Sequence, residues 1–241
     1  MNILGIGGYS HDSAAALVCD GEIVAAVAEE RLTRIKHQGG PPIEAVRYCL
    51  DSAGLSPSDV QHLGCYMKPG LRVGKRWKYR MTQLPRNPFY SAAYMGYEVV
   101  HNLRFRRDMR NLCGPGTQLH FMEHHPAHVA SSYYVSGFDD SALLSIDYIG
   151  EMTSTWAGVG RGSSIDPIYE IEYPHSLGVF YSAITDYLGF LRASDEYKVM
   201  GLASYGEPEF IDEFRKLILE NGDGYRVNLS WMAYHLSLIH I

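Results

Sequence analysis

The sequence repeats one order of predicted elements, and this repeat constrains the fold more than any other feature. An apolar strand, a polar loop that carries an aspartate, a second strand, a turn and a third strand are followed by a helix. The first copy occupies residues 3–7, 8–13, 14–19, 20–21 and 22–30, with its helix at 42–54. The second copy occupies residues 142–147, 148–153, 154–160 and 167–173, with its helix at 177–188. Two such copies predict an internal duplication.

The duplicated pattern predicts an α/β protein of the actin-like, ribonuclease-H-like (ASKHA) architecture, built from repeated ββαβ units. In this architecture paired hairpin loops face each other across a nucleotide or phosphate cleft, so Asp12 and Asp147 would be equivalent loop aspartates. We expect a first subdomain at residues 1–140, with helices inserted at about 68–115, and an incomplete second subdomain at 141–241.

The composition is that of a globular protein, because 46% of the 241 residues are hydrophobic, which is enough for a packed core. The formal net charge is −6, yet the stretch from Lys68 to Arg110 holds eleven Lys or Arg against Glu98 and Asp108, so it could meet an anion. The four cysteines stand far apart without a CxxC pair. This spacing favours buried thiols over disulfides or a zinc knot.

Neither end of the chain predicts export or membrane insertion. The N-terminus lacks a basic segment followed by a long apolar one, and no run of about 18 apolar residues occurs, so we expect a cytoplasmic protein. After about residue 221 the regular patterning is lost, and residues 236–241 match no element. We interpret this end as a truncated reading frame whose last residues are not native.

The sequence HHPAH at 124–128 is the densest group of candidate metal ligands. It follows an apolar strand and begins a predicted helix. Because His124 and His128 are four residues apart, both imidazoles point from one face if the helix reaches back to His124, whereas His125 points elsewhere. Asp147, at the end of the next strand, is placed to add a carboxylate. Such a set with open positions suits iron(II), manganese or zinc.

Spacing alone leaves open that His124 and His128 cap or line a helix N-terminus and bind no metal. The motif is not HExxH, since His125 takes the position of the glutamate base, so a zincin protease is not expected.

The first polar loop contains His11 and Asp12 after two glycines. Glycines let backbone amides approach a phosphate, and a neutral His11 beside them could act as a general base toward a hydroxyl. A loop His-Asp pair is also a common turn, and Asp12 could equally cap residues 14–16. Function and local structure both remain open for this pair.

Two charged segments complete the candidates. Residues 29–37, which include Arg31 and Lys36, close the third predicted strand and could bind phosphate or carboxylate groups, or form a solvated, salt-bridged edge. Residues 195–206 place Lys198 and Gly201 at a loop-to-helix boundary, where backbone amides suit the phosphates or ribose of a nucleotide.

Five motifs in this order, GIGGYSHDSAAALV, VAEERLTRIKH, HHPAHVASSYY, SIDYIGE and DEYKVMGLASYGEP, closely resemble the carbamoyltransferase family of nodulation and antibiotic-tailoring enzymes. The resemblance covers residues 3 to about 210. It implies an N-terminal half similar to proteins of the tRNA threonylcarbamoyladenosine type. In the family, a C-terminal (YrdC-like) domain, absent from this chain, makes carbamoyl-adenylate from carbamoyl phosphate and ATP, and the N-terminal domain passes the carbamoyl group to a substrate hydroxyl.

The resemblance also implies roles for individual residues, with a further aspartate ligand expected beyond Ile241. Together with the motifs above, it gives His11 as base and Lys36 as a contact to carbamoyl-adenylate, substrate or nucleotide contacts at Asp12, Arg31, Lys198 and Gly201, and metal ligands at His124, His128 and Asp147. The implied metal is iron(II), with manganese or zinc as alternatives. The implied partner is a small-molecule hydroxyl acceptor, which is an antibiotic, a sugar or a glycan. We expect no membrane or nucleic-acid partner. The chain could form a homodimer.

One departure from the family affects the acceptor. After Asp147 the family usually has glycine, whereas this sequence has Tyr148, whose ring is expected to narrow or reline the pocket.

Three other functions compete with carbamoyl transfer. A relative that adds threonylcarbamoyl to tRNA would bind RNA through the basic segment 68–110. A sugar kinase of the same architecture would need no carbamoyl phosphate, and a non-catalytic module would bind ADP or a metal only.

Overall fold

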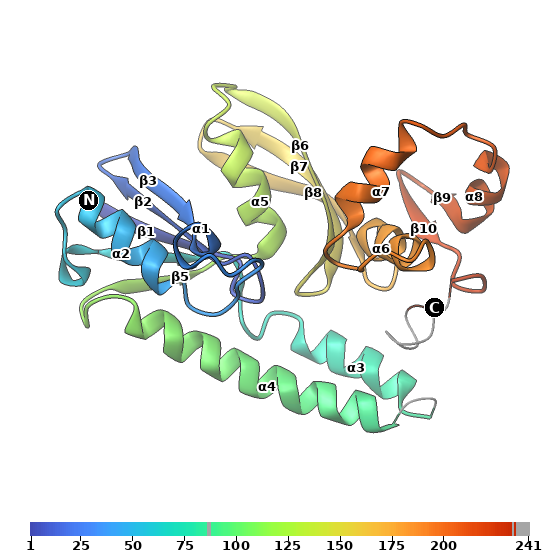
Figure 1. Ribbon diagram of the computed structural model, residues 1–241, viewed down its shortest axis with the longest axis horizontal. Helices are drawn as coiled ribbons and strands as arrows, with labels where there is room; N and C mark the ends of the chain where they lie inside the picture. Colours follow the sequence, from blue (N-terminus) through green and yellow to red (C-terminus); the bar gives the residue numbers. More distant parts are fainter. Residues whose placement is uncertain (86–87, 233, 235–241) are drawn as a thin grey trace. The chain divides into compact units, whose positions relative to one another are not determined.

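The computed structural model describes residues 1–85, 88–232 and 234 (Figure 1). Contacts divide the chain into two compact units: unit 1 is residues 1–71 with 93–127, and unit 2 is residues 72–92 with 128–241. The expected non-native end at 236–241 lies outside the described residues. No helix within the described ranges has the length and apolar character needed to cross a bilayer.

Unit 1 is built on a five-stranded mixed sheet with the order β3-β2-β1-β4-β5. Its strands are β1 (Asn2–Gly7), β2 (Ala14–Cys19), β3 (Glu22–Ala28), β4 (His62–Cys65) and β5 (Gln118–Phe121). The first three strands form an antiparallel meander, β4 pairs parallel with β1, and β5 pairs parallel with β4. This order and these directions are those of a ribonuclease-H-like unit. The predicted fold class is therefore confirmed by the strand pairing.

The turn and the core of unit 1 follow from sequence signals. Asp20 and Gly21 connect β2 to β3, and both have positive φ (50° and 94°), as a tight hairpin turn requires. Helix α2 (Ile43–Ser52) packs against β2 and β3, and the short 3₁₀ helix η1 (Pro57–Asp59) precedes β4. Helix α4 (Pro88–Asn111) supplies Phe105 and Met109 to the same core as the sheet residues.

The third strand ends earlier than predicted. Helix α1 (Glu29–Thr33) follows β3 directly, so the prediction of a strand reaching residue 30 is wrong. The cause is Glu29, which is 2% exposed and whose carboxylate accepts hydrogen bonds from the backbone N–H groups of Glu44 (3.1 Å) and Ala45 (2.7 Å). Helix α2 has no cap from its own N-cap side chain at Pro42. Glu29 therefore satisfies the N-terminus of α2 from a distant segment.

Unit 2 repeats the antiparallel meander with the order β6-β7-β8. The strands are β6 (Asp140–Gly150), β7 (Thr153–Arg161) and β8 (Ser164–Glu172), and α6 (Leu177–Tyr187) packs on β6. The predicted polar loop at 148–153 is wrong, because β6 continues to Gly150 and only two residues precede β7. The pairing shifts between Ile146 and Gly150, so a strand irregularity, rather than a long loop, carries Asp147.

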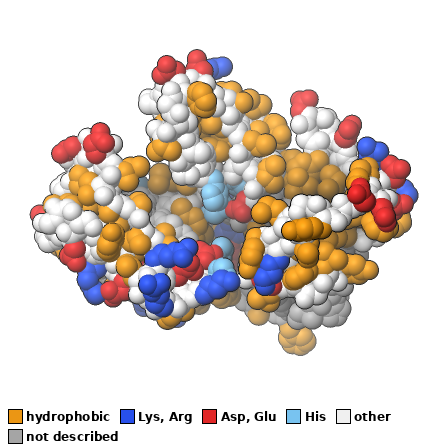
Figure 2. All heavy atoms as spheres, turned by 45° about the horizontal axis from the view of Figure 1, so that its top comes forward, with side chains coloured by type: hydrophobic (Ala, Val, Ile, Leu, Met, Phe, Trp, Pro, Cys, Tyr) orange, Lys and Arg blue, Asp and Glu red, His pale blue; other side chains and the backbone are white. Residues whose placement is uncertain are grey.

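Unit 2 also contains α3 (Val73–Gln83), α7 (Glu196–Ala203), α8 (Ile211–Leu217) and a hairpin of β9 (Ile218–Asn221) with β10 (Gly224–Val227). Helices α3 and α4 lie within the stretch 68–115, and α3 belongs to unit 2. The chain just before α3 is anchored by Arg72, which forms ion pairs with Glu170 (2.5 Å) and Glu172 (3.1 Å) of β8. Many hydrophobic side chains stay exposed in the region of α6 to α8, at the right of Figure 2.

Candidate metal centre

Helix α5 (His124–Tyr133) presents the candidate histidines. Its later part packs on the β6-β7-β8 sheet through Val129 and Tyr133, both 3% exposed. A Cβ atom at Gly160 would lie 2.5 Å from the ring of Tyr133, so the glycine of β7 lets the helix approach the sheet closely. The helix begins at His124, which is the condition that the ligand prediction required.

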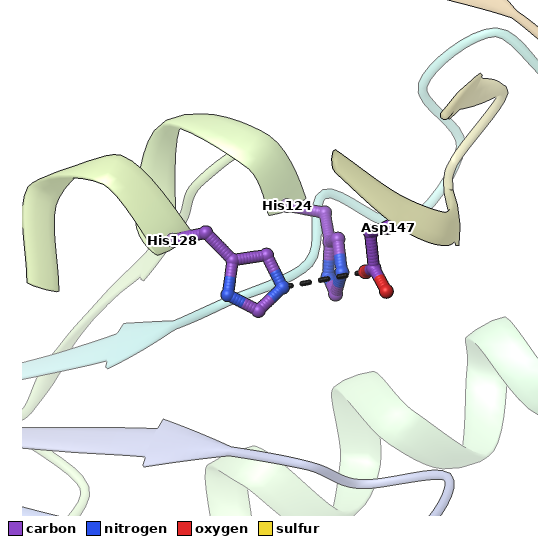
Figure 3. A group of neighbouring side chains, drawn as sticks. All are labelled: His124, His128 and Asp147. Atoms are coloured by element: carbon purple, nitrogen blue, oxygen red, sulfur yellow. Dashed lines mark ion pairs between the residues drawn. The ribbon is translucent and has the colours of Figure 1, made fainter. Parts of the chain in front are cut away.

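His124 and His128 lie one helical turn apart, and Asp147 approaches them from β6 (Figure 3). Nε2 of His128 is 3.4 Å from Oδ2 of Asp147. One ligand atom from each of the three side chains lies within 4.8 Å of the other two. Metal bonds to imidazole nitrogen and carboxylate oxygen are about 2.0–2.2 Å long, so small side-chain shifts would bring all three atoms onto one ion. The structure thus brings the three predicted ligands together.

Backbone groups at the end of β6 fix the carboxylate of Asp147. The N–H of Tyr148 donates to Oδ1 at 2.6 Å, while Oδ2 is the oxygen nearest His128. Ser176 caps α6 by accepting a backbone N–H, and its hydroxyl donates to the carbonyl oxygen of Tyr148 at 2.7 Å. A Cβ at Gly178 would lie 2.6 Å from the carbonyl oxygen of Asp147, so the start of α6 packs directly against the strand that carries the ligand.

The protonation of His128 depends on Asp147. Their hydrogen bond raises the pKa of His128 above its ordinary value, although burial alone would lower it. A proton and a metal ion at this site would therefore compete for the same imidazole. His125 is 1% exposed and does not belong to the ligand group, which agrees with the prediction that it points elsewhere.

A small pocket of about 270 Å³ opens beside His128 and Asp147 on unit 2. Leu144 and Ile146 of β6 line it, together with Ser132 of α5. His128 and Asp147 therefore face open space in which a further ligand or a substrate group can lie. Two imidazoles and one carboxylate beside such a space fit a divalent metal, and this donor set is typical of iron(II) sites but also accepts manganese or zinc.

The candidate residues of the first polar loop, His11 and Asp12, lie in unit 1. Nδ1 of His11 is 2.8 Å from Oδ2 of Asp12, and Nδ1 of His37 is 2.8 Å from Oδ1 of the same carboxylate. Burial raises the pKa of Asp12, but the hydrogen bonds from both rings outweigh it and lower the pKa overall. Asp12 lies in a loop before strand β2, so the possible helix cap at residues 14–16 is wrong.

Sequence reasoning missed the part that His37 takes in this group. In the sequence His37 is simply the last residue of the charged run 29–37, and its pairing with Asp12 depends on two loops meeting in space. Arg31 lies exposed on α1, and Lys36 lies exposed in the loop that follows. Both cations therefore remain accessible to a charged ligand.

Comparison with known proteins identifies the family. The family model described as carbamoyltransferase N-terminus matches residues 2–239. The chain belongs to this carbamoyltransferase family. The uncharacterized protein sll1178 of Synechocystis is 41% identical over 98% of this chain and 40% of that protein. Nodulation protein NolNO of Sinorhizobium fredii is 35% identical over 92% of this chain and 32% of that protein. The chain thus spans less than half the length of these two relatives.

A solved structure of YeaZ from Pseudomonas aeruginosa aligns with 70% of the chain and 65% of its own length, at 16% identity and a TM-score of 0.36. The fold class of this family member is assigned from the strand order and strand directions of unit 1, described above.

The side chain of Tyr148, where this carbamoyltransferase family member departs from the usual glycine, packs toward α6. The ring packs beside Val179 and Phe180 of α6, and its hydroxyl accepts a hydrogen bond from Arg192 at 3.2 Å. Tyr148 does not line the pocket beside His128. Asp147 faces that pocket while Tyr148 does not, because successive residues of a strand point to opposite faces, and the effect of Tyr148 on the acceptor stays a prediction.

The nucleotide-side candidates of the family lie on α7 in unit 2. Nζ of Lys198 is 2.8 Å from Oδ1 of Asp195, one turn earlier. A Cβ at Gly201 would meet nothing within 4 Å, so packing does not require glycine at this position. Lys198 and Gly201 are three residues apart on one helix and therefore share a face.

Proposed function

We propose that this chain is the acceptor-side part of an O-carbamoyltransferase, which moves a carbamoyl group from carbamoyl-adenylate to a substrate hydroxyl. The observation that carries the proposal is the convergence of His124, His128 and Asp147 in a member of the carbamoyltransferase family. Carbamoyl-adenylate would be made from carbamoyl phosphate and ATP. The acceptor would be a small molecule such as an antibiotic, a sugar or a glycan.

The chemistry is an acyl transfer. The acceptor oxygen attacks the carbamoyl carbon, a new C–O bond forms, and the bond between that carbon and the phosphate oxygen of AMP breaks, so that AMP leaves. His11 accepts the proton of the hydroxyl. His124, His128 and Asp147 would hold a divalent metal, which would supply positive charge to stabilise the charge developing on the reacting oxygens.

The remaining candidates bind the charged donor. Arg31 and Lys36 are exposed cations on and after α1, and they would contact the phosphate and carbamoyl groups of carbamoyl-adenylate. Lys198 and Gly201 share a face of α7 and would contact the nucleotide. In this arrangement Asp12 contacts His11 rather than the donor.

Metal binding provides the first test. We expect purified chain to contain about one equivalent of iron, manganese or zinc by elemental analysis after anaerobic loading. His124→Ala and His128→Ala should each lose this metal, because two remaining ligands rarely suffice. His120→Ala, at an exposed histidine of β5, is the matched control and should keep it. Full metal retention in both ligand variants would remove these residues from the site.

Transfer provides the second test. Carbamoyl-adenylate is supplied to the chain with an aminoglycoside, glucose, a chito-oligosaccharide or water alone, and release of AMP and carbamoylated product are followed by mass spectrometry. We expect the chain to accelerate AMP release, and His11→Ala to reduce this rate by roughly 10²–10⁴-fold, the usual contribution of a general base. No acceleration over buffer with any of these acceptors, or an unchanged rate in His11→Ala, would contradict the proposal.

A tRNA-modifying transferase is the second candidate, and the basic stretch 68–110 is the observation that favours it. Two of its cations are already paired within unit 2, since Arg72 contacts Glu170 and Lys75 lies 2.7 Å from Glu172. This pairing reduces the charge available to RNA, and we therefore rank this candidate second. Binding of tRNA that weakens steeply with added salt would reverse the ranking.

A further inference from the structure

Two loops of unit 1 are joined along their length. The first follows β1 and contains His11 and Asp12, and the second follows α1 and contains His37. Backbone hydrogen bonds connect Ser13 N–H to the carbonyl of Gln38 (2.9 Å) and Gly40 N–H to the carbonyl of Tyr9 (2.7 Å). The two loops therefore form one structural element, held mainly by main-chain contacts.

Close contact between the loops is possible only because Gly39 has no side chain. A Cβ at this position would lie 2.5 Å from the carbonyl oxygen of Ser10, which is an impossible contact. The glycine lets the second loop lie against the first, directly beside His11 and Asp12. The relative position of Asp12 and His37 is thus set by the backbone.

Asp12 is held between two imidazole rings in this element. Its two carboxylate oxygens contact Nδ1 of His11 and Nδ1 of His37, each at 2.8 Å. The backbone N–H of His37 donates to Oε2 of Glu30 at 3.0 Å, which fixes the base of the His37 side chain. Asp12 and His37 both have positive φ, 53° and 56°, which is uncommon for residues other than glycine. Such strained positions persist where surrounding contacts hold them, and they often mark functional sites.

The contacts decide the tautomer of both rings. An ionised carboxylate only accepts hydrogen bonds, so the Nδ1 atoms that face it must carry the protons. In the neutral state, Nε2 of His11 then keeps its lone pair, directed away from Asp12. A ring with the opposite tautomer would present a lone pair to the carboxylate and an N–H to the substrate, and it could not accept a proton at Nε2.

We propose that Asp12 is a positioning residue, held in place by His37, that fixes the Nδ1–H tautomer of His11 so that Nε2 can take the proton of the acceptor hydroxyl. This inference rests on the proposed function for the role of His11 as the base, but its structural part does not. Asp12 itself touches neither donor nor acceptor in this arrangement, and it remains ionised while His11 takes up the proton. Its role is that of the orienting third group in an acid-base relay.

The structural part is tested on the chain itself, without any substrate. Histidine labelled with ¹⁵N is incorporated, and long-range ¹H–¹⁵N correlation at about pH 8, above the ordinary histidine pKa of about 6.5, reports the tautomer of each ring. His11→Gln and His37→Gln assign the two sets of signals. We expect a bare Nε2 for both rings in the wild type. A bare Nδ1 on His11 in the wild type would overturn the inference whatever the enzyme does.

Substitution of Asp12 supplies the second readout. Asp12→Asn presents an amide NH₂ to one of the rings, so the signal of His11 or His37 should shift toward the Nε2–H tautomer. Asp51→Asn, at an exposed aspartate of α2, is the matched control and should leave both rings unchanged. Wild-type tautomers at both rings in Asp12→Asn would show that the carboxylate does not set them, and would contradict the inference.

The transfer assay separates this inference from the proposed function. If His11 is the base and Asp12 positions it, Asp12→Asn should slow carbamoyl transfer by of order tenfold or more, less than removal of His11, and with little change in KM. A loss in His11→Ala with full activity in Asp12→Asn would overturn the positioning role and leave the proposed function intact. Full activity in His11→Ala would overturn the proposed function, and with it the catalytic meaning of the tautomer.

Discussion

The direction of the Tyr148 side chain decides which neighbours its ring can contact. Because its ring packs beside Val179 and Phe180 and its hydroxyl meets Arg192, we expect it to contribute to stability rather than to the pocket. Tyr148→Phe should lower the free energy of unfolding by about 1 kcal/mol, the usual value of one hydrogen bond, and Tyr148→Ala by about 3 kcal/mol. Urea denaturation measures both changes.

The control at the same scale is Tyr187→Ala, since that ring is 83% exposed and should change the free energy of unfolding by less than about 0.5 kcal/mol. Metal content should stay at the wild-type level in both Tyr148 variants. Loss of metal with unchanged stability would mean that the ring acts on the ligand side of β6 after all.

Residue types and spacing predicted that His124, His128 and Asp147 lie together, but not the contact between Asp12 and His37. His124 and His128 could be placed because an i, i+4 spacing fixes a shared helix face as soon as a helix is predicted. Asp12 and His37 could not be paired, because their contact depends on how two irregular loops lie against each other. Loop conformation follows from many weak main-chain contacts that leave no periodic signal in the sequence.

At the scale of elements, the link between Glu29 of α1 and the start of α2 is the least expected contact. Glu29→Ala should lower the free energy of unfolding by about 2 kcal/mol, since it leaves two buried N–H groups without their charged acceptor. Glu44→Ala is the matched control in the first turn of the same helix, because its side chain is 41% exposed and pairs with Arg47 at the surface. It should change stability by less than about 0.5 kcal/mol. Equal effects of the two substitutions would contradict the capping role.

The order of elements could be predicted far better than their ends. Apolar runs and the Asp20-Gly21 turn located both meanders, because the strand period and the turn residues are local signals. The end of β3 cannot be predicted from the sequence, because a glutamate such as Glu29 is expected at the surface unless its hydrogen-bond partners in α2 are known. The end of β6 cannot be predicted in the same way, because Gly150 is typical of a loop although Tyr148 and Ile149 extend the strand up to it.

At the scale of the whole molecule, bound metal should stabilise the folded chain. A ligand that binds only the folded state adds RT ln(1 + [L]/Kd), which is about 2.7 kcal/mol when its free concentration is a hundred times Kd. Chemical denaturation under anaerobic conditions, with and without iron(II) or manganese, measures this increment. His128 must be neutral to bind metal, and its hydrogen bond with Asp147 raises its pKa, so the increment should shrink as pH falls through that pKa.

The matched pair for this measurement lies in one sheet. Asp147→Asn should lose most of the metal-dependent increment, because an amide is a far weaker ligand than a carboxylate, whereas Asp166→Asn on an exposed part of β8 should keep all of it. An increment that persists in Asp147→Asn would place the metal elsewhere on the chain. An increment that vanishes in both variants would mean that general surface charge, rather than one carboxylate beside two histidines, binds the ion.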